Sequence, residues 1–195
     1  MIITDPVGAQ SFEIIRDRLA MILAVELEGQ VLMTGNYDLE CRVWMERNVP
    51  FGIEELPCVN VAFIEGKYGI RPVDQSDGVY QFNIDVYHRK ASIQGAGGDS
   101  LSMVALQRLL GVCRSIVQDA KYKWLGFNPG FIAYRNITSI AVEDWNIQDT
   151  AGAARGRLIV EVKAPERSAL INPPMLDSKQ TILELNETEK GYFYE

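Results

Sequence analysis

This sequence has almost no histidine and little cysteine, the residues on which many catalytic and metal-binding sites depend. His88 is the only histidine among 195 residues, so any Ser-His-Asp or Cys-His catalytic group would have to include it. It stands at the end of a predicted strand, in phase with the apolar positions, where a histidine without a recognisable partner favours a structural role. One histidine and three scattered cysteines also disfavour a zinc site. We therefore expect no catalytic, cofactor-binding or metal-binding residues.

The three cysteines, Cys41, Cys58 and Cys113, are odd in number and include no Cys-x-x-Cys pair. This pattern predicts free thiols in a reducing compartment. The sequence also lacks an uninterrupted run of about 18 apolar residues, which argues against a membrane span. Its first residues, Met-Ile-Ile-Thr-Asp-Pro, lack the basic start and the apolar stretch of a signal peptide. These absences predict a protein that is made and used in a cytosol, with no membrane partner.

Positive charge is in the minority, because 19 Lys and Arg residues stand against 26 Asp and Glu residues, for a net charge of -7. A broad nucleic-acid-binding surface needs clustered positive charge, so this balance argues against one. It is compatible with an acidic surface past which DNA slides without sticking. The length of 195 residues and the hydrophobic fraction of 47% predict one core, and hence a single domain with a tail.

The first apolar pattern predicts a helix from about residue 5 to residue 28, with Asp5 as its cap and Pro6 in its first turn. One side of this helix carries an apolar stripe at helical spacing: Phe12, Ile15, Leu19, Ile22 and Leu23. Ile14, Met21 and Val25 form a second stripe on roughly the opposite side. A helix that covers one face of a sheet needs only one stripe. The second stripe is therefore either covered by loops or used as a subunit contact.

Five segments with alternating apolar and polar residues predict strands. They cover residues 39–46, 59–63, 80–88, 137–147 and 157–164. Residues 66–78 are polar and contain Pro72, which is typical of a connection, and the small residues at 151–156 are typical of a hairpin loop.

Residues 100–121 predict a second helix with one apolar and one polar side. The order of these elements predicts an α+β fold, in which two helices pack on a mixed or antiparallel sheet. We assign residues 1–166 to a single α+β domain. The pattern weakens after Pro165, and we assign residues 167–195 to an extended C-terminal arm.

Two further features could belong to an active site. Gly95-Ala96-Gly97-Gly98 precedes the second helix, but no Gly-Lys-Ser/Thr follows it, so a plain strand-to-helix loop is favoured over phosphate binding. The acidic pairs Glu54-Glu55 and Glu143-Asp144 leave a carboxylate site for metal-assisted chemistry open. Neighbouring residues on a strand point to opposite faces, however, so Glu143 and Asp144 are not expected to share a site.

The order helix, three strands, helix, two strands and arm resembles the tail-terminator family of tailed bacteriophages, whose members complete the tail at its neck. The N-terminal helix ending near Leu27 and three segments carry this resemblance: LPCVNVAF at 56–63, GVYQFNIDVYHR at 78–89 and GRLIVEVKAP at 156–165. A Leu-Pro-x-Val entry to a strand is frequent in such proteins. The stretch from Val31 to Asn48 and the thirty-residue tail depart from the pattern.

The resemblance implies a structural protein without catalytic residues or cofactors. Such proteins form a ring, usually a hexamer, which caps the completed tail tube and joins it to the head. The implied partners are further copies of the chain, the tail tube protein and the head-completion protein, with DNA passing through without specific binding. The implied location is the virion, after assembly in the host cytoplasm.

Two alternatives stay open. One is a head-completion or neck connector protein, and the other is a cytosolic enzyme with an unrecognised carboxylate site. A pocket lined by two or more convergent acids would favour the enzyme, whereas a closed ring would favour the terminator.

For the ring, we place the subunit contact at Ile14, Met21 and Val25, and expect the C-terminal arm to lie across the neighbouring subunit. Asp85 and Glu161, on the polar faces of their strands, are candidates to line an acidic lumen.

Overall fold

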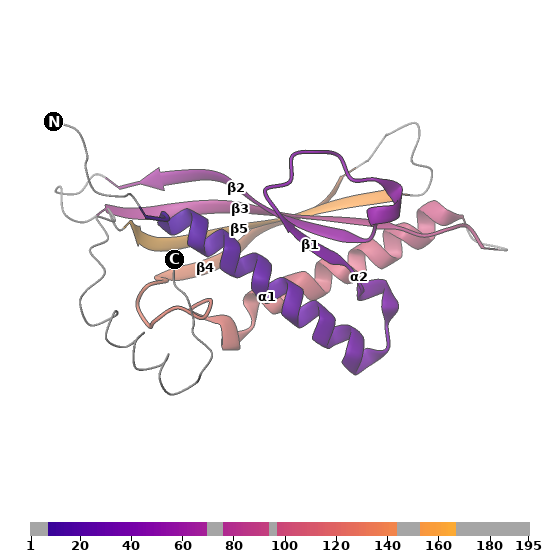
Figure 1. Cartoon of the computed structure of the whole chain (residues 1–195), viewed down its shortest axis with the longest axis horizontal. Helices are drawn as coiled ribbons and strands as arrows, with labels where there is room; N and C mark the ends of the chain where they lie inside the picture. The colour runs from indigo at the N-terminus through magenta and orange to yellow at the C-terminus, as the bar shows by residue number, and fades with distance from the viewer. Residues whose placement is uncertain (1–7, 70–75, 94–96, 144–152, 167–195) are drawn as a thin grey trace, which may run out of the picture. The chain divides into compact units, whose positions relative to one another are not determined.

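The computed structural model describes residues 8–69, 76–93, 97–143 and 153–166 (Figure 1). These residues contain two helices, α1 (Ser11–Thr34) and α2 (Gly98–Gln118), and five strands. The strands are β1 (Arg42–Met45), β2 (Cys58–Tyr68), β3 (Ser76–Arg89), β4 (Tyr134–Glu143) and β5 (Ala153–Glu166). Short 3₁₀ turns occur at η1 (Tyr37–Leu39), η2 (Ile53–Glu55) and η3 (Ala120–Tyr122). The predicted α+β fold is confirmed.

Residues Gln10–Arg167 form one compact unit, which contains all of these elements. A second unit combines Met1–Ala9 with Ser168–Glu195, and of its residues only Gly8 and Ala9 are described. The arm expected at residues 167–195 lies outside the described residues, so the domain boundary at residue 166 stays a prediction.

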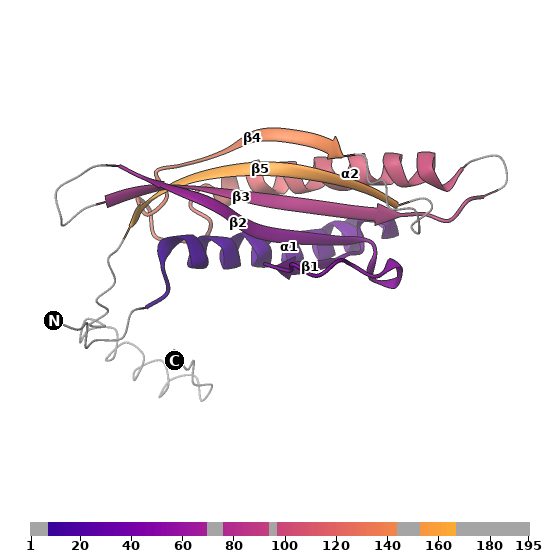
Figure 2. The ribbon, with the colours of Figure 1, turned by 90° about the horizontal axis from the view of Figure 1, so that it is seen from above.

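The strands form one mixed sheet in the order β1-β2-β3-β5-β4. β1 runs parallel to β2, and the other neighbouring strands are antiparallel. Both helices cover the same face of this sheet, α1 over β1 and β2 and α2 over β3 and β5. Figure 2 views the sheet from its other side, with the helices behind the strands. We name the covered side the helix face and the other side the open face.

The hydrophobic core lies between the helix face and the two helices. β3 and β5 each send every second side chain into it, which is why their sequences alternate so regularly. The register sets Phe82 opposite Val160 and Ile84 opposite Leu158, and all four residues are 0% exposed. Burying one large apolar side chain typically stabilises a fold by about 1.5–3 kcal/mol. The apolar sides predicted for α2 and for the inner stripe of α1 face this core: Ile15, Leu19, Leu23, Leu106, Leu109 and Val117 are among the buried residues.

The boundaries of α1 differ from the prediction at both ends. The helix begins at Ser11, where the backbone N–H of Gln10 donates to the Glu13 carboxylate at 2.6 Å. Asp5 and Pro6 lie outside the described residues, but residues 8–10 are not helical, so the predicted start is wrong. The helix also continues past residue 28, because the first left-handed residue is Gly35 (φ 64°), whose N–H donates to the Val31 carbonyl at 2.8 Å.

Strand boundaries differ as well. The segment predicted at 39–46 is a strand only at Arg42–Met45, with Leu39 buried in η1 instead. The connection predicted at 66–78 is wrong at both ends, since β2 continues to Tyr68 and β3 begins at Ser76. β4 begins at Tyr134, and the predicted residues 144–147 lie outside the described part of the chain.

Gly156 belongs to β5 and not to the predicted hairpin loop. It lies on the helix face, where an added Cβ would be 2.5 Å from Cδ1 of Leu110 on α2. A glycine is therefore required at this position because the helix packs so close to the strand, and not because the chain needs a flexible turn there.

α2 is long and apolar enough to cross a membrane, judged by length and composition alone. Its residues Ser100–Gln118 have a mean hydropathy of 1.3, although charged and polar residues interrupt them. Half of this stretch, 50%, is buried inside the structure, as in a helix whose apolar side packs on a sheet. The core therefore accounts for the hydropathy of α2, and the absence of a membrane partner stays a prediction.

Candidate assembly interface

A row of apolar side chains follows the outer side of α1, opposite the core. A helix turns by roughly 100° per residue, so spacings of seven and four keep Ile14, Met21, Val25 and Leu32 within about 40° of arc. Met21 is 48% exposed, Val25 59% and Leu32 80%, whereas Ile14 is half-buried. We name these four residues the outer stripe. Among the described residues no loop covers this stripe, and both explanations that the sequence left open, cover by another segment and a subunit contact, stay predictions.

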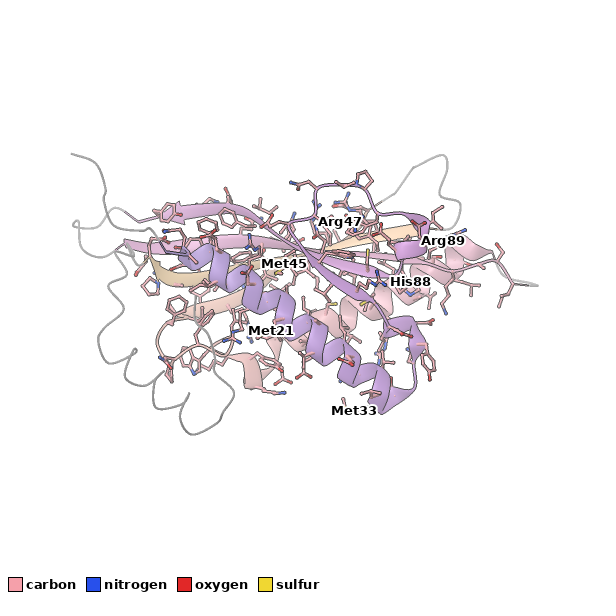
Figure 3. The ribbon with its side chains drawn as sticks, viewed as in Figure 1. Met21, Met33, Met45, Arg47, His88 and Arg89 are labelled. Carbon is pink, nitrogen blue, oxygen red and sulfur yellow. The ribbon has the colours of Figure 1, made fainter. Side chains whose placement is uncertain are left out.

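Two more exposed methionines lie close to the outer stripe. Met33 follows Leu32 on α1 and is 70% exposed, and Met45 on β1 is 52% exposed (Figure 3). The ion pair between Arg16 and Glu46, at 3.4 Å, ties α1 to the end of β1 beside Met45. The sequence analysis missed Leu32 and Met33 because it ended the helix at residue 28. The seven-residue spacing from Val25 to Leu32 could have revealed the first of them.

The open face carries an ion cluster of two carboxylates and two guanidinium groups. Asp85 of β3 accepts from Arg157 Nε at 2.6 Å and lies 3.5 Å from Nη2 of Arg155. The same two arginines reach the Glu143 carboxylate at 3.1 and 3.2 Å. The hydrogen bond to Asp85 is the largest influence on Arg157 and raises the pKa of its guanidinium. Asp85 is 6% exposed and its charge is paired, and its place in a lumen stays a prediction.

Glu161 also lies on the open face, as predicted, because its register partner Gln81 alternates with the inward Tyr80 and Phe82. Its carboxylate accepts from the Tyr134 hydroxyl at 2.6 Å, and this bond raises the pKa of Tyr134 to about 12. Glu161 is half-buried, and its place in a lumen stays a hypothesis.

The loop between β1 and β2 covers one end of the open face. Arg47 binds the Glu55 carboxylate with two bonds of 2.6 and 2.8 Å, and its guanidinium stacks 4.5 Å from the Phe51 ring centroid. The buried Asn60 amide bonds to both backbone groups of Arg47, at 3.1 and 3.2 Å. Figure 3 shows Arg47 on the side of the sheet away from the helices. These contacts close this end of the face to a partner.

His88 and the cysteines lie buried or half-buried within the subunit. His88 is 2% exposed, and its Nε2 lies 3.1 Å from the Asp38 carbonyl oxygen. Burial lowers the pKa of His88 and raises the pKa of both Cys41 and Cys58 to about 12. All three cysteines are free thiols, as expected from their number. In the described ranges, no group of three or more His, Cys, Asp or Glu side chains is arranged to hold a metal ion.

A pocket of about 220 Å³ lies between α1 and α2, and Glu26 and Asp119 are among the residues that line it. Glu26 accepts from Lys121 Nζ at 2.7 Å and from the Tyr122 hydroxyl, and these bonds lower the pKa of Glu26. Asp119 accepts from the Lys121 backbone N–H at 2.8 Å. Each carboxylate is therefore engaged by a donor of the same chain, and neither has the unpaired geometry of a general base.

A scan of the chain against models of known protein families finds no match, and a search of curated proteins finds no significant match either. The likeness to tail terminators thus rests on the order of elements and on the sequence segments given above.

Proposed function

We propose that this chain is a structural ring subunit that caps the tail tube of a phage-type particle and joins the tail to the head. The observation that carries the proposal is the outer stripe of α1, which is apolar, exposed and directed away from the core. Further copies of the chain, the tube protein and the head-completion protein are the partners, and DNA passes through without specific binding. The protein acts in the virion and performs no catalysis.

The outer stripe needs an explanation outside the isolated subunit. Apolar surface gains about 25 cal/mol for each Å² removed from water, so exposed leucine, methionine and valine side chains on one line favour association. α1 packs over β1 and β2 at one end of the sheet order, and β4 forms a different surface at the other end. A closed ring uses two different surfaces of each subunit, and the chain offers them.

The net charge of -7 supports passage of DNA over tight binding, because a protein of this sign repels the phosphate backbone. Asp85 and Glu161, the two acids placed in the lumen, are paired with Arg157 and with Tyr134, and the proposal keeps both as candidates to line it.

A neck connector between head and tail has the same ring architecture and differs only in its partner. Binding to purified tail tubes separates the two, since a terminator binds the tube without the head and a connector binds the completed head. No contact of the described residues favours the enzyme alternative, because Glu26 and Asp119 are both engaged within the chain.

Light scattering combined with negative-stain microscopy tests the proposal. We expect a mass that is an integral multiple of 21.9 kDa, and closed rings either in solution or on the ends of added tail tubes. A protein that stays monomeric at high concentration and neither binds tubes nor heads would refute the structural role.

A further inference from the structure

The sheet has two edges, and the edge strand β4 has few charges within the described residues and a bulge between Ile137 and Ser139. Its residues 136–142 carry no charge and no proline, and they lie between Arg135 and Glu143. Ile140 is 51% exposed and Val142 is 42% exposed. Soluble proteins normally protect such an edge with charges, prolines or covering segments, because its free N–H and C=O groups can pair with another strand. The β4 edge can therefore pair with a strand of a partner.

The other edge of the same sheet has the direction that such pairing needs. β1 is parallel to β2, and three antiparallel steps then lead through β3 and β5 to β4. β4 consequently runs opposite to β1. Neighbouring strands of a sheet are rotated by roughly 20–25° relative to one another, so the rotation between copies must carry this twist forward to keep β4 antiparallel to the next β1. Under such a rotation, β4 of one copy meets β1 of the next copy in an antiparallel arrangement.

The register across the sheet identifies the residues that would face one another. Met45 is the register partner of Val61, Val61 of Ile84, and Ile84 of Leu158. Leu158 in turn is the register partner of Ile140, so Met45 and Ile140 lie at the same level of the sheet. The same pairings give four matched levels: Arg42 with Glu143, Val43 with Val142, Trp44 with Ala141 and Met45 with Ile140. The whole length of β1 is thus matched by the last four residues of β4.

The matched residues are complementary in charge, size and polarity. Arg42 and Glu143 carry opposite charges. The large Trp44 stands opposite the small, exposed Ala141 on the open face. On the helix face, Met45 and Ile140 are each about half exposed in the single subunit, at 52% and 51%. Pairs of these kinds, directly opposite on neighbouring strands, stabilise an antiparallel sheet.

We propose that β1 of one copy pairs antiparallel with residues 140–143 of β4 in the next copy, so that the sheet continues from subunit to subunit. This inference rests on the proposed function, because it takes a further copy of the chain as the partner. The outer stripe of α1 lies at the β1 end of the sheet and adds to the same side of the contact. β1 and α1 form one surface, and β4 forms the other.

Cysteine cross-linking tests the pairing in the full-length protein. A variant with both Met45→Cys and Ile140→Cys is oxidised and analysed on a denaturing gel without reductant. Facing residues of paired strands lie close enough for a disulfide. The two positions are separated by four strand spacings within one subunit, about 19 Å, so they cannot bond within the chain. We expect a ladder of covalent dimers, trimers and larger species.

Three controls make the result specific. Met45→Cys alone and Ile140→Cys alone should give no ladder, because each leaves only one of the two facing thiols. Met45→Cys combined with Tyr134→Cys moves the second thiol six residues along β4, about 20 Å, and should also give none. The native Cys58 and Cys113 are buried and Cys41 is half-buried. Any cross-linking that they give by themselves is measured in the protein without added cysteines.

The outcomes separate the pairing from the ring itself. If rings form but the Met45→Cys/Ile140→Cys variant gives no ladder, the pairing is wrong and the proposed function stands. An equal ladder from the Tyr134→Cys pair contradicts the register, and a dimer from either single variant contradicts the head-to-tail contact. If the chain neither cross-links nor associates with itself or with tubes, both proposals are overturned.

Discussion

Asp85 holds a negative charge that is almost completely removed from water, with 6% of the residue exposed. Arg157 stabilises this buried carboxylate: its Nε lies 2.6 Å from one carboxylate oxygen and its Nη2 lies 3.2 Å from the other. Arg155 adds a longer contact at 3.5 Å. A buried charge that loses its partner is costly, whereas an exposed ion pair contributes little. The two arginines are therefore not equivalent, and Arg157 dominates.

The first prediction follows from this geometry. Arg157→Ala should lower the free energy of unfolding by on the order of 2–3 kcal/mol, because the Asp85 carboxylate is left with only the weaker contact to Arg155. Lys163→Ala is the matched control on the same strand and face, since its pair with Asp77 is 3.6 Å long and partly exposed. Urea denaturation measures both variants. Equal losses in the two would show that Asp85 does not depend on Arg157.

A second residue-scale prediction concerns pH. Burial lowers the pKa of His88, although the hydrogen bond that His88 donates to the Asp38 carbonyl opposes this shift. The folded protein therefore takes up a proton less readily than the unfolded chain, whose histidine titrates near about 6.5. The contribution of His88 to stability is complete above that pH and is lost as the pH falls through the lowered folded pKa. Asp38 and Lys90 are the charged groups that influence it.

His88→Gln should accordingly reduce the loss of stability between about pH 7 and pH 5, where carboxylates contribute less than they do in stronger acid. Unfolding by urea at several pH values, for the variant and the unchanged protein, measures this slope. Identical slopes would contradict the assignment of His88 as a buried neutral residue. Ring assembly should persist in the variant, because His88 lies at no proposed contact.

The contact between Asp85 and Arg157 in the ion cluster on the open face could not be predicted from the sequence. Alternation in β3 and β5 correctly predicts that Asp85 and Arg157 point away from the core. That they face each other depends on the register between two strands separated by about 70 residues, which neither local pattern contains. Asp85 was therefore predicted on the correct face but without its arginine partner.

At the scale of elements, the outer stripe of α1 supports a direct test of the subunit contact. Met21→Glu should weaken association at least about tenfold, equivalent to about 1.4 kcal/mol, because a charge would be buried at the contact. The isolated subunit should keep its stability within about 0.5 kcal/mol, since Met21 is 48% exposed and outside the core. Sedimentation and thermal denaturation measure the two effects separately.

Ala24→Glu is the matched control for Met21→Glu. It adds the same charge to the same helix at an exposed position, about 60° or more away from the outer stripe. Association should be nearly unchanged in this variant. Equal weakening by both variants would indicate a general charge effect, and no weakening by Met21→Glu would remove the outer stripe from the interface.

The helices and strands that the sequence predicts best are those with one apolar face and one polar face. α2, β3 and β5 combine one buried and one polar face over 14 or more residues, and each was predicted as the correct type of element, although both strands begin earlier than predicted. β1 has only four residues, and the pattern that extended it to Leu39 in fact continues through a 3₁₀ turn. The start of α1 was misplaced because Asp5-Pro6 is a typical helix start, whereas Gln10 and Glu13 provide the cap in the structure.

At the scale of the whole molecule, exposed apolar groups occur at both ends of the strand order. The outer stripe and Met45 belong to the β1 end, and Ile140 and Val142 belong to the β4 end. A twofold dimer would need one self-complementary patch, whereas these are two different surfaces. Contacts between unlike surfaces lead to a closed ring or to an open filament, according to the rotation between subunits. This arrangement favours a ring over a dimer.

The last prediction concerns the residues beyond β5. The Ser11 hydroxyl donates to the Pro165 carbonyl at 2.9 Å, and β5 runs to Glu166, so the fold requires the chain up to that point. Removal of residues 168–195 should leave the melting temperature of the unit Gln10–Arg167 almost unchanged. If the arm lies across a neighbouring subunit, the same truncation should lower the fraction of ring at a given concentration, measured by light scattering. Unchanged assembly would assign the interface to α1, β1 and β4 alone, and a lower melting temperature would show instead that the arm belongs to the fold of its own subunit.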